Sequence, residues 1–166
     1  MPKTLDELAA ESEIKDVHLR FCRANDRRDE ELFRGCFHAD AVVEMGDASL
    51  TVDEIVAVSK QMLDRYAVTW HAVSNQLVEV KGDTAWAEHY TISSHRFAAS
   101  ETAPLRDWVA HGRYIDRMER RDGEWRIARR RFLVDYTRTD LVAAGDPEMP
   151  GGAARDRSDL SYAMRV

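Results

Sequence analysis

Two histidines on consecutive predicted strands are the first candidates for chemistry in this sequence. His71 stands near the start of a predicted strand over 68–81, and His95 stands in the next predicted strand, over 84–99. Free imidazole has a pKa of about 6.5, so a histidine can take a proton from carbon at neutral pH with little tuning. Such a base needs a carboxylate on its other ring nitrogen, to fix the tautomer, and a proton donor near the leaving group.

The spacing of these strands predicts which residues meet. A hairpin that turns at Gly82-Asp83 places His71 opposite the region of His95, at the end far from the turn. Residues two apart share a strand face, so Asn75 shares the face of His71 and is a candidate hydrogen bonder in the same cavity. His89 is six residues from His95, roughly 20 Å along a strand, so these two cannot serve one small site.

A second predicted hairpin, turning at Asp122-Gly123, adds polar candidates. Its register places Tyr114 opposite Arg131. Tyr114 could donate a proton or hold a water, and Arg131 could stabilise an enolate. In the run 129–131 we expect one inward arginine between two outward ones, although parity does not say which face lines a cavity. The histidine spacing offers no third ligand, so we predict no metal site.

The element order predicts an α+β fold. The capping boxes Thr4 to Glu7 and Thr51 to Glu54 open two helices, which end near 26 and 66, and a short helix is expected over 29–37. A turn is expected at 38–40. Strands are expected at 41–45, 68–81, 84–99, 108–121 and 124–136. We predict a cone-shaped α+β barrel over 1–138, with N-terminal helices packed in a curved, mostly antiparallel sheet, and an irregular tail over 139–166 that contains Pro147 and Pro150.

Composition narrows the partners. The net charge of −6 disfavours non-specific binding to nucleic acid. No apolar run approaches the roughly 20 residues that are needed to span a bilayer. The first residues lack the apolar core of a signal peptide, so we expect a cytoplasmic protein with no membrane partner. Cys22 and Cys36 fall in apolar helical patterns, and we expect two reduced thiols in the core.

Several separated motifs resemble the SnoaL-like family of the nuclear transport factor 2-like superfamily, whose fold is a cystatin-like α+β cone. The similarity covers about residues 5–138 and is closest to the branch of scytalone dehydratase, bile-acid dehydratase and dehydrochlorinase. The motifs that carry it are Asn25-Asp26-Arg27-Arg28-Asp29, Phe37-His38-Ala39-Asp40-Ala41, His71-Ala72-Val73-Ser74-Asn75, Gly82-Asp83-Thr84-Ala85 and Glu119 to Ile127.

The resemblance implies roles for individual residues. Asp26 stands where the family keeps a catalytic aspartate, His71 where it keeps the histidine base, and His95 where scytalone dehydratase has a second active-site histidine. The chain departs from that enzyme at four positions: Asn25 and Met45 replace two substrate-orienting tyrosines, and Gly112 and Tyr114 replace a serine and an asparagine that contact ligand. We assign Phe21 and Met45 to the cavity lining, and we do not expect scytalone as substrate.

We therefore predict a cofactor-independent, dehydratase-like lyase or isomerase. An Asp26–His71 dyad would abstract a carbon-bound proton from a small hydrophobic or aromatic ring substrate, in a homodimer or homotrimer. Two alternatives stay open. A non-catalytic ligand-binding or oligomerisation module would bury the same pair without a cavity of about 300 Å³ or more. A polyketide-cyclase-like enzyme would use an acid rather than His71 as its base.

Overall fold

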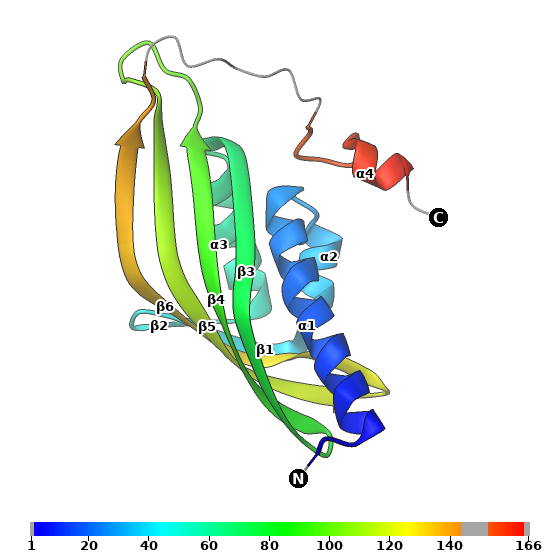
Figure 1. The fold of residues 1–166 in the computed structure, drawn as a ribbon. Helices are drawn as coiled ribbons and strands as arrows, with labels where there is room; N and C mark the ends of the chain where they lie inside the picture. Colours follow the sequence, from blue (N-terminus) through cyan, green and yellow to red (C-terminus); the bar gives the residue numbers. More distant parts are fainter. Residues whose placement is uncertain (1, 144–152, 165–166) are drawn as a thin grey trace.

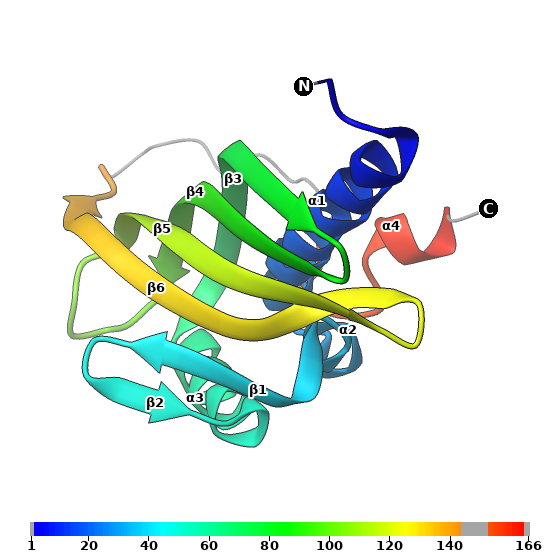
Figure 2. The same ribbon diagram turned by 90° about the horizontal axis from the view of Figure 1, so that it is seen from below.

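A six-stranded sheet wraps around two helices in the computed structural model, which describes residues 2–143 and 153–164. The strand order is β2-β1-β6-β5-β4-β3, and only β1 and β6 pair in parallel. Figures 1 and 2 show the long strands curving around α1 and α3. The elements are α1 (Leu5–Asp26), α2 (Glu30–Gly35), β1 (Phe37–Met45), β2 (Ala48–Leu50), α3 (Val52–Leu63), β3 (Tyr66–Lys81), β4 (Thr84–Phe97), β5 (Arg106–Arg121), β6 (Glu124–Leu141) and α4 (Leu160–Ala163). The predicted α+β cone is confirmed.

Both long helices begin where the capping boxes predict. The Thr4 and Thr51 side chains accept from backbone N–H groups three residues on, and Glu7 and Glu54 reach back to the cap residues. Helix α1 ends at Asp26, where the chain turns through Arg28 with φ of 50°. Asp26 is therefore the last residue of the helix that lies inside the cone.

The core lies between α1 and the inner face of the sheet. Phe21, Phe33 and Phe37 pack with ring centroids 5.1–5.9 Å apart. Cys22 and Cys36 are free and buried, as predicted, and burial raises the pKa of the Cys36 thiol to about 11. None of the helices in the described part of the chain has the length and apolar character that crossing a bilayer requires.

The structure corrects three expectations. Residues 38–40, expected as a turn, belong to β1, where the buried His38 bonds the Glu119 carbonyl through Nε2 at 2.9 Å. The short strand β2 was not expected. Strand β6 runs to Leu141, past the expected strand end at 136. The short helix α4 lies within the segment 139–166. Pro147 and Pro150 lie outside the described residues.

Candidate active site

An apolar cavity of about 520 Å³ opens inside the cone. Its lining comes from the three helices α1 to α3 and from strands β1 and β3 to β6. Phe21, Met45 and Tyr114 all line it, where the sequence placed them. The other apolar lining residues are Phe33, Phe37, Val43, Ile55, Val58, Met62, Trp108, Phe132, Leu133 and Val134.

His71 lies in the wall of this cavity, hydrogen-bonded to Asp26. Nδ1 of His71 is 2.7 Å from Oδ1 of Asp26, and the His71 backbone N–H donates to Oδ2 at 3.1 Å. The two side chains are only 8% and 13% exposed. A carboxylate oxygen accepts, so in the neutral form of the ring Nδ1 is the donor to Asp26 and Nε2 is the nitrogen with the free lone pair.

His95 lies beside His71, as the hairpin spacing predicted. The two rings meet edge to face, with centroids 5.2 Å apart, although the directly paired residues are His71 and Ser93. His95 also packs against Tyr66 and Trp108. Burial, reinforced by the nearby His71 and Arg155, lowers the pKa of His95 to about 4, so its ring is neutral at physiological pH.

Asn75 does not reach the cavity. It is exposed and sits in a β-bulge between Ser74 and Leu77, with φ of 49°. The extra residue reverses the alternation of faces beyond it, so the neighbouring Gln76 points inward and bonds His18 at 3.2 Å. The prediction that Asn75 shares the inward face of His71 was wrong for this reason.

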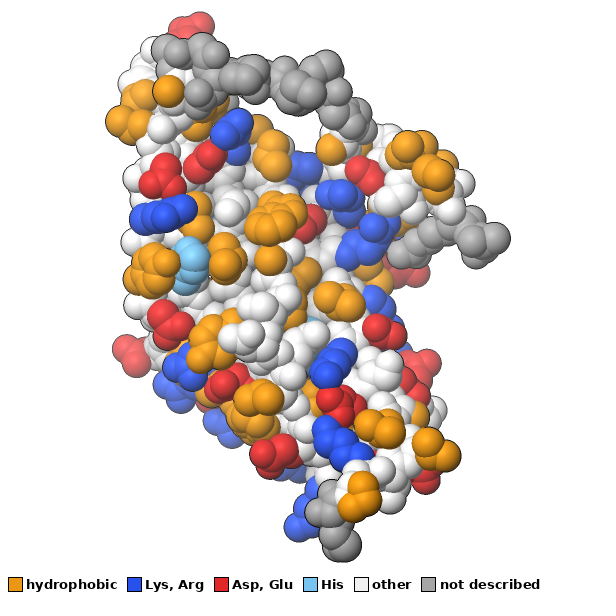
Figure 3. Space-filling view, in the orientation of Figure 1, with side chains coloured by type: hydrophobic (Ala, Val, Ile, Leu, Met, Phe, Trp, Pro, Cys, Tyr) orange, Lys and Arg blue, Asp and Glu red, His pale blue; other side chains and the backbone are white. Residues whose placement is uncertain are grey.

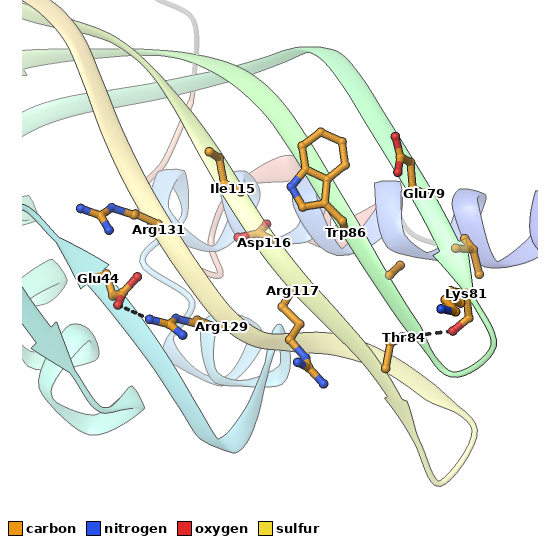
Figure 4. Close-up of a pocket in the computed structure, with 12 residues that line it drawn as sticks. Glu44, Glu79, Lys81, Thr84, Trp86, Ile115, Asp116, Arg117, Arg129 and Arg131 are labelled. Carbon is orange, nitrogen blue, oxygen red and sulfur yellow. Dashed lines mark hydrogen bonds and ion pairs between the residues drawn. The ribbon is translucent and has the colours of Figure 1, made fainter.

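The inward arginine is Arg130. A bulge between Arg117 and Met118 shifts the register of β5 and β6, so Tyr114 pairs with Phe132 and not with Arg131 as predicted. The exposed Arg131 borders the cavity but also lines a groove on the outer sheet face, where Figure 4 shows it with Arg129 and Arg117. Arg130 is 1% exposed and lines the cavity.

Arg130 is held by a buried polar network. Its guanidinium donates to both oxygens of Asp116, at 2.8 and 2.6 Å, and lies 4.3 Å from the ring centres of Phe21 and Tyr114. His18 Nε2 lies 3.3 Å from the same carboxylate. Burial alone would raise the pKa of Asp116, but Arg130 and His18 hold it below its usual range.

The same network contains one group with metal-ligand chemistry. Donor atoms of His18, His89 and Asp116 lie within 4.8 Å of one another. The Arg130 guanidinium already supplies the positive charge that balances the carboxylate. All four side chains are fully buried, so the arrangement favours a structural ion pair over an ion site.

Two substitutions relative to the family pattern have local explanations. Asn25 lines the cavity, donates to the Phe21 carbonyl at 2.9 Å and accepts from Ser59 at 3.1 Å. At Gly112 a β-carbon would lie 2.4 Å from the Leu133 carbonyl oxygen, so a serine does not fit there.

Ser59, Ser93, Trp108 and Arg130 also line the cavity but were missed as site residues. Ser93 follows from strand parity with His95, and that signal was available. Ser59 and Trp108 depend on how α3 and β5 pack, which the sequence pattern does not show.

Comparisons with known proteins fit this geometry. The LinA type 3 hexachlorocyclohexane dehydrochlorinase of Novosphingobium barchaimii has a TM-score of 0.72 at 19% identity, over 89% of this chain and 99% of that one. A Novosphingobium aromaticivorans protein, suggested to be a scytalone dehydratase, has a TM-score of 0.72 at 21% identity, over 86% and 97%. A cystatin-like protein of unknown function from Nostoc punctiforme has a TM-score of 0.62 at 23% identity, over 80% and 93%.

Because these sequence identities are low, the structural likeness establishes the fold alone. No curated protein sequence matches the chain significantly. The family model described as a SnoaL-like domain matches residues 6–131, a range that includes both Asp26 and His71. The chain therefore belongs to the SnoaL-like domain family.

Proposed function

We propose that this protein is a cofactor-independent lyase or isomerase that removes a carbon-bound proton from a small apolar ring substrate. One observation carries the proposal: the Asp26–His71 hydrogen bond of 2.7 Å lies in the wall of a cavity of about 520 Å³. A neutral imidazole with its tautomer fixed is a general base suited to neutral pH. In this proposal the protein acts in the cytoplasm, and its reaction needs no metal or organic cofactor.

The reaction proceeds from the free nitrogen of His71. Nε2 takes the proton, and the C–H electron pair becomes the π bond of an enolate or an alkene. In an elimination the leaving group departs with the electron pair of its own bond to carbon, and a hydroxyl group leaves as water by taking the proton that His71 holds. Asp26 stabilises the imidazolium that forms, because its carboxylate already accepts from Nδ1 and from the backbone N–H. In an isomerase the same proton returns to another carbon; in a lyase water or halide leaves.

Two further groups support charge that develops on the substrate. His95 is neutral because its pKa is lowered to about 4, so it acts as a hydrogen-bond donor to the leaving group and not as an imidazolium acid. Arg130 takes the role expected of Arg131, because its buried guanidinium faces the cavity and its Nη1 has no hydrogen-bond partner in the described chain. A preorganised positive group at a developing oxyanion is worth about 3 kcal/mol.

The cavity favours this function over an assembly module, which would fill the cone with side chains. Its volume exceeds the roughly 300 Å³ of a small-molecule site, and its lining is mostly apolar with a few polar groups near His71. Among the solved relatives, the dehydrochlorinase and the suggested scytalone dehydratase are named for eliminations.

The test separates proton removal from loss of the leaving group. Wild type, His71→Ala and Asp26→Ala are incubated in D₂O with cyclic ketones, and deuterium incorporation is followed by NMR; elimination is then assayed on β-hydroxy ketones and halogenated alicyclic compounds. We expect each variant to lose on the order of 10²- to 10⁴-fold in both assays, because both abolish the oriented base.

His111→Ala is the matched control, because His111 stacks on Tyr136 on the outer face of β5 and β6, at 4.4 Å between centroids, and does not line the cavity. It should react like wild type. Full activity in His71→Ala would rule out this base and favour the cyclase-like alternative, in which an acid removes the proton. Binding of the same ketones without exchange or turnover in the wild type would favour the non-catalytic module.

A further inference from the structure

The described tail segment, residues 153–164, is fastened to the helical side of the cone. Figures 1 and 2 show α4 beside α1 and α2. The Tyr162 hydroxyl donates to Asp29, the N-cap of α2, at 2.9 Å, and Arg23 of α1 donates to Ser161 at 3.0 Å. Arg157 adds contacts with Asp29 at 3.4 Å and Glu31 at 2.9 Å. These contacts hold the segment against α1 and the start of α2.

Arg155 leaves this segment in another direction, toward the end of α3. Its guanidinium donates to the Leu63 carbonyl at 3.4 Å from both terminal nitrogens, and to the Tyr66 carbonyl. Leu63 is the last residue of α3 and Tyr66 the first of β3. Carbonyls at a helix C-terminus lack intrahelical partners and carry partial negative charge, so a guanidinium there caps the helix.

The corner that Arg155 caps supports the site directly. The Tyr66 ring packs on His95 with centroids 4.7 Å apart, and His95 in turn meets His71 at 5.2 Å. The positive charge of Arg155 also acts on the site: it helps to lower the pKa of His95. Burial and Arg28 lower the pKa of Arg155 itself, and the Asp26 carboxylate opposes that shift.

We propose that Arg155 is a positioning residue for the candidate active site, holding the corner between α3 and β3 so that Tyr66 seats His95 beside His71. The described segment 153–164 thus supports the site through the α3–β3 corner, and none of its residues lines the cavity. This inference rests on the proposed function for its catalytic meaning, but its structural content stands independently. The groups with charge or titratable protons around His95 are His71 and Tyr66 on β3, Arg155 in the tail, and Asp26 behind His71.

The experiment compares Arg155→Gln, Arg155→Lys and Arg157→Gln in the full-length protein. Histidine side chains are labelled with ¹³C, and the ring signals of His71 and His95 are followed by NMR as pH falls from 8 to 5. In Arg155→Gln we expect both ring signals to shift at pH 8 and His95 to begin titrating at higher pH than in wild type. Arg155→Lys keeps the charge but not the paired carbonyl contacts, so the signals should shift while the titration stays close to wild type.

Arg157→Gln is the matched control: Arg157 contacts only Asp29 and Glu31 among described acidic groups, and the Ser161 and Tyr162 contacts still hold the segment when it is replaced. Its histidine signals should match wild type. Unchanged ring signals in Arg155→Gln, or the same changes in Arg157→Gln, would overturn the proposal. Where turnover exists, Arg155→Gln should lower kcat more than it raises KM. These NMR outcomes need no substrate, so they can fail or succeed separately from the proposed reaction.

Discussion

Burial lowers the pKa of His18, His89 and His95 in the folded protein, and the rings of His89 and His95 are neutral at physiological pH. Burial is the main cause in each, and it lowers the pKa of His89 to about 2 and of His95 to about 4. In the unfolded chain each would titrate near its ordinary value of about 6.5. The contribution of these histidines to the free energy of unfolding is therefore fully present above about pH 6.5. It is lost as the pH drops from there toward the folded pKa values, because only the unfolded chain takes up protons.

Substitution of His89 tests this reasoning. Both of its ring nitrogens are buried without a hydrogen-bond partner among the described residues. We expect His89→Leu to unfold at higher temperature than wild type, and the gain to change little above about pH 7. Below pH 6.5 the gain should grow, with a slope that approaches about 1.4 kcal/mol per pH unit near pH 5 for the one proton removed. Thermal unfolding measured across this range by circular dichroism gives the comparison.

Tyr114→Phe serves as the control for that measurement. Tyr114 packs on His89 with centroids 5.2 Å apart, and burial raises its pKa, so it does not titrate in acid. Its stability should follow the same pH slope as wild type. A His89→Leu curve parallel to wild type would show that His89 takes up its proton in both states.

Among the elements, the helix starts and the hairpin turn could be predicted from the sequence, whereas the β-bulges that interrupt the alternation of strand faces could not. Capping boxes located both long helices, and the Gly82-Asp83 turn placed His71 near His95. Each β-bulge inserts one residue with little sequence signal, and each reversed the assigned faces beyond it. Asn75 was therefore assigned inward, where Gln76 belongs, and Tyr114 was paired with Arg131 in place of Phe132.

The bulge at Asn75 gives a prediction whose sign opposes strand propensity. Asn75 has φ of 49°, in the left-handed region where a β-branched residue is strained. Asn75→Val should therefore lower the free energy of unfolding by about 1–2 kcal/mol, although valine favours strands. Asn75→Gly should stay within about 0.5 kcal/mol of wild type or exceed it, because glycine adopts this conformation freely. Urea unfolding measures both; a stabilised valine variant would mean that the bulge is not retained.

For the whole molecule, the two faces of the sheet have different partners. The inner face is closed by α1, α3 and the cavity, and it buries Ala87, His89 and Thr91 almost completely. On the same strand, Trp86, Tyr90 and Ile92 alternate to the outer face and are 37–40% exposed. They form an outer patch with His111 and Tyr136, whose rings are stacked. Figures 3 and 4 show hydrophobic side chains on the strand side of the molecule, interspersed with charged ones, including Trp86 beside Arg117.

An exposed patch of this kind, built on a rigid sheet, is typical of a surface that pairs with another protein surface. We expect the chain, of 19.0 kDa, to form a homodimer or homotrimer through the outer patch. Ile92 lies at its centre, between Ala72 of β3 and His111 of β5. Ile92→Lys should therefore convert the oligomer to monomer in light scattering after size exclusion, because burying an unpaired charge there costs several kcal/mol.

Leu8→Lys adds the same charge at a 49% exposed position on α1 and should keep the wild-type mass. If both variants keep the mass of the oligomer, the copies associate through another surface, and a wild-type monomer at micromolar concentration would leave the outer patch without a second copy as its partner.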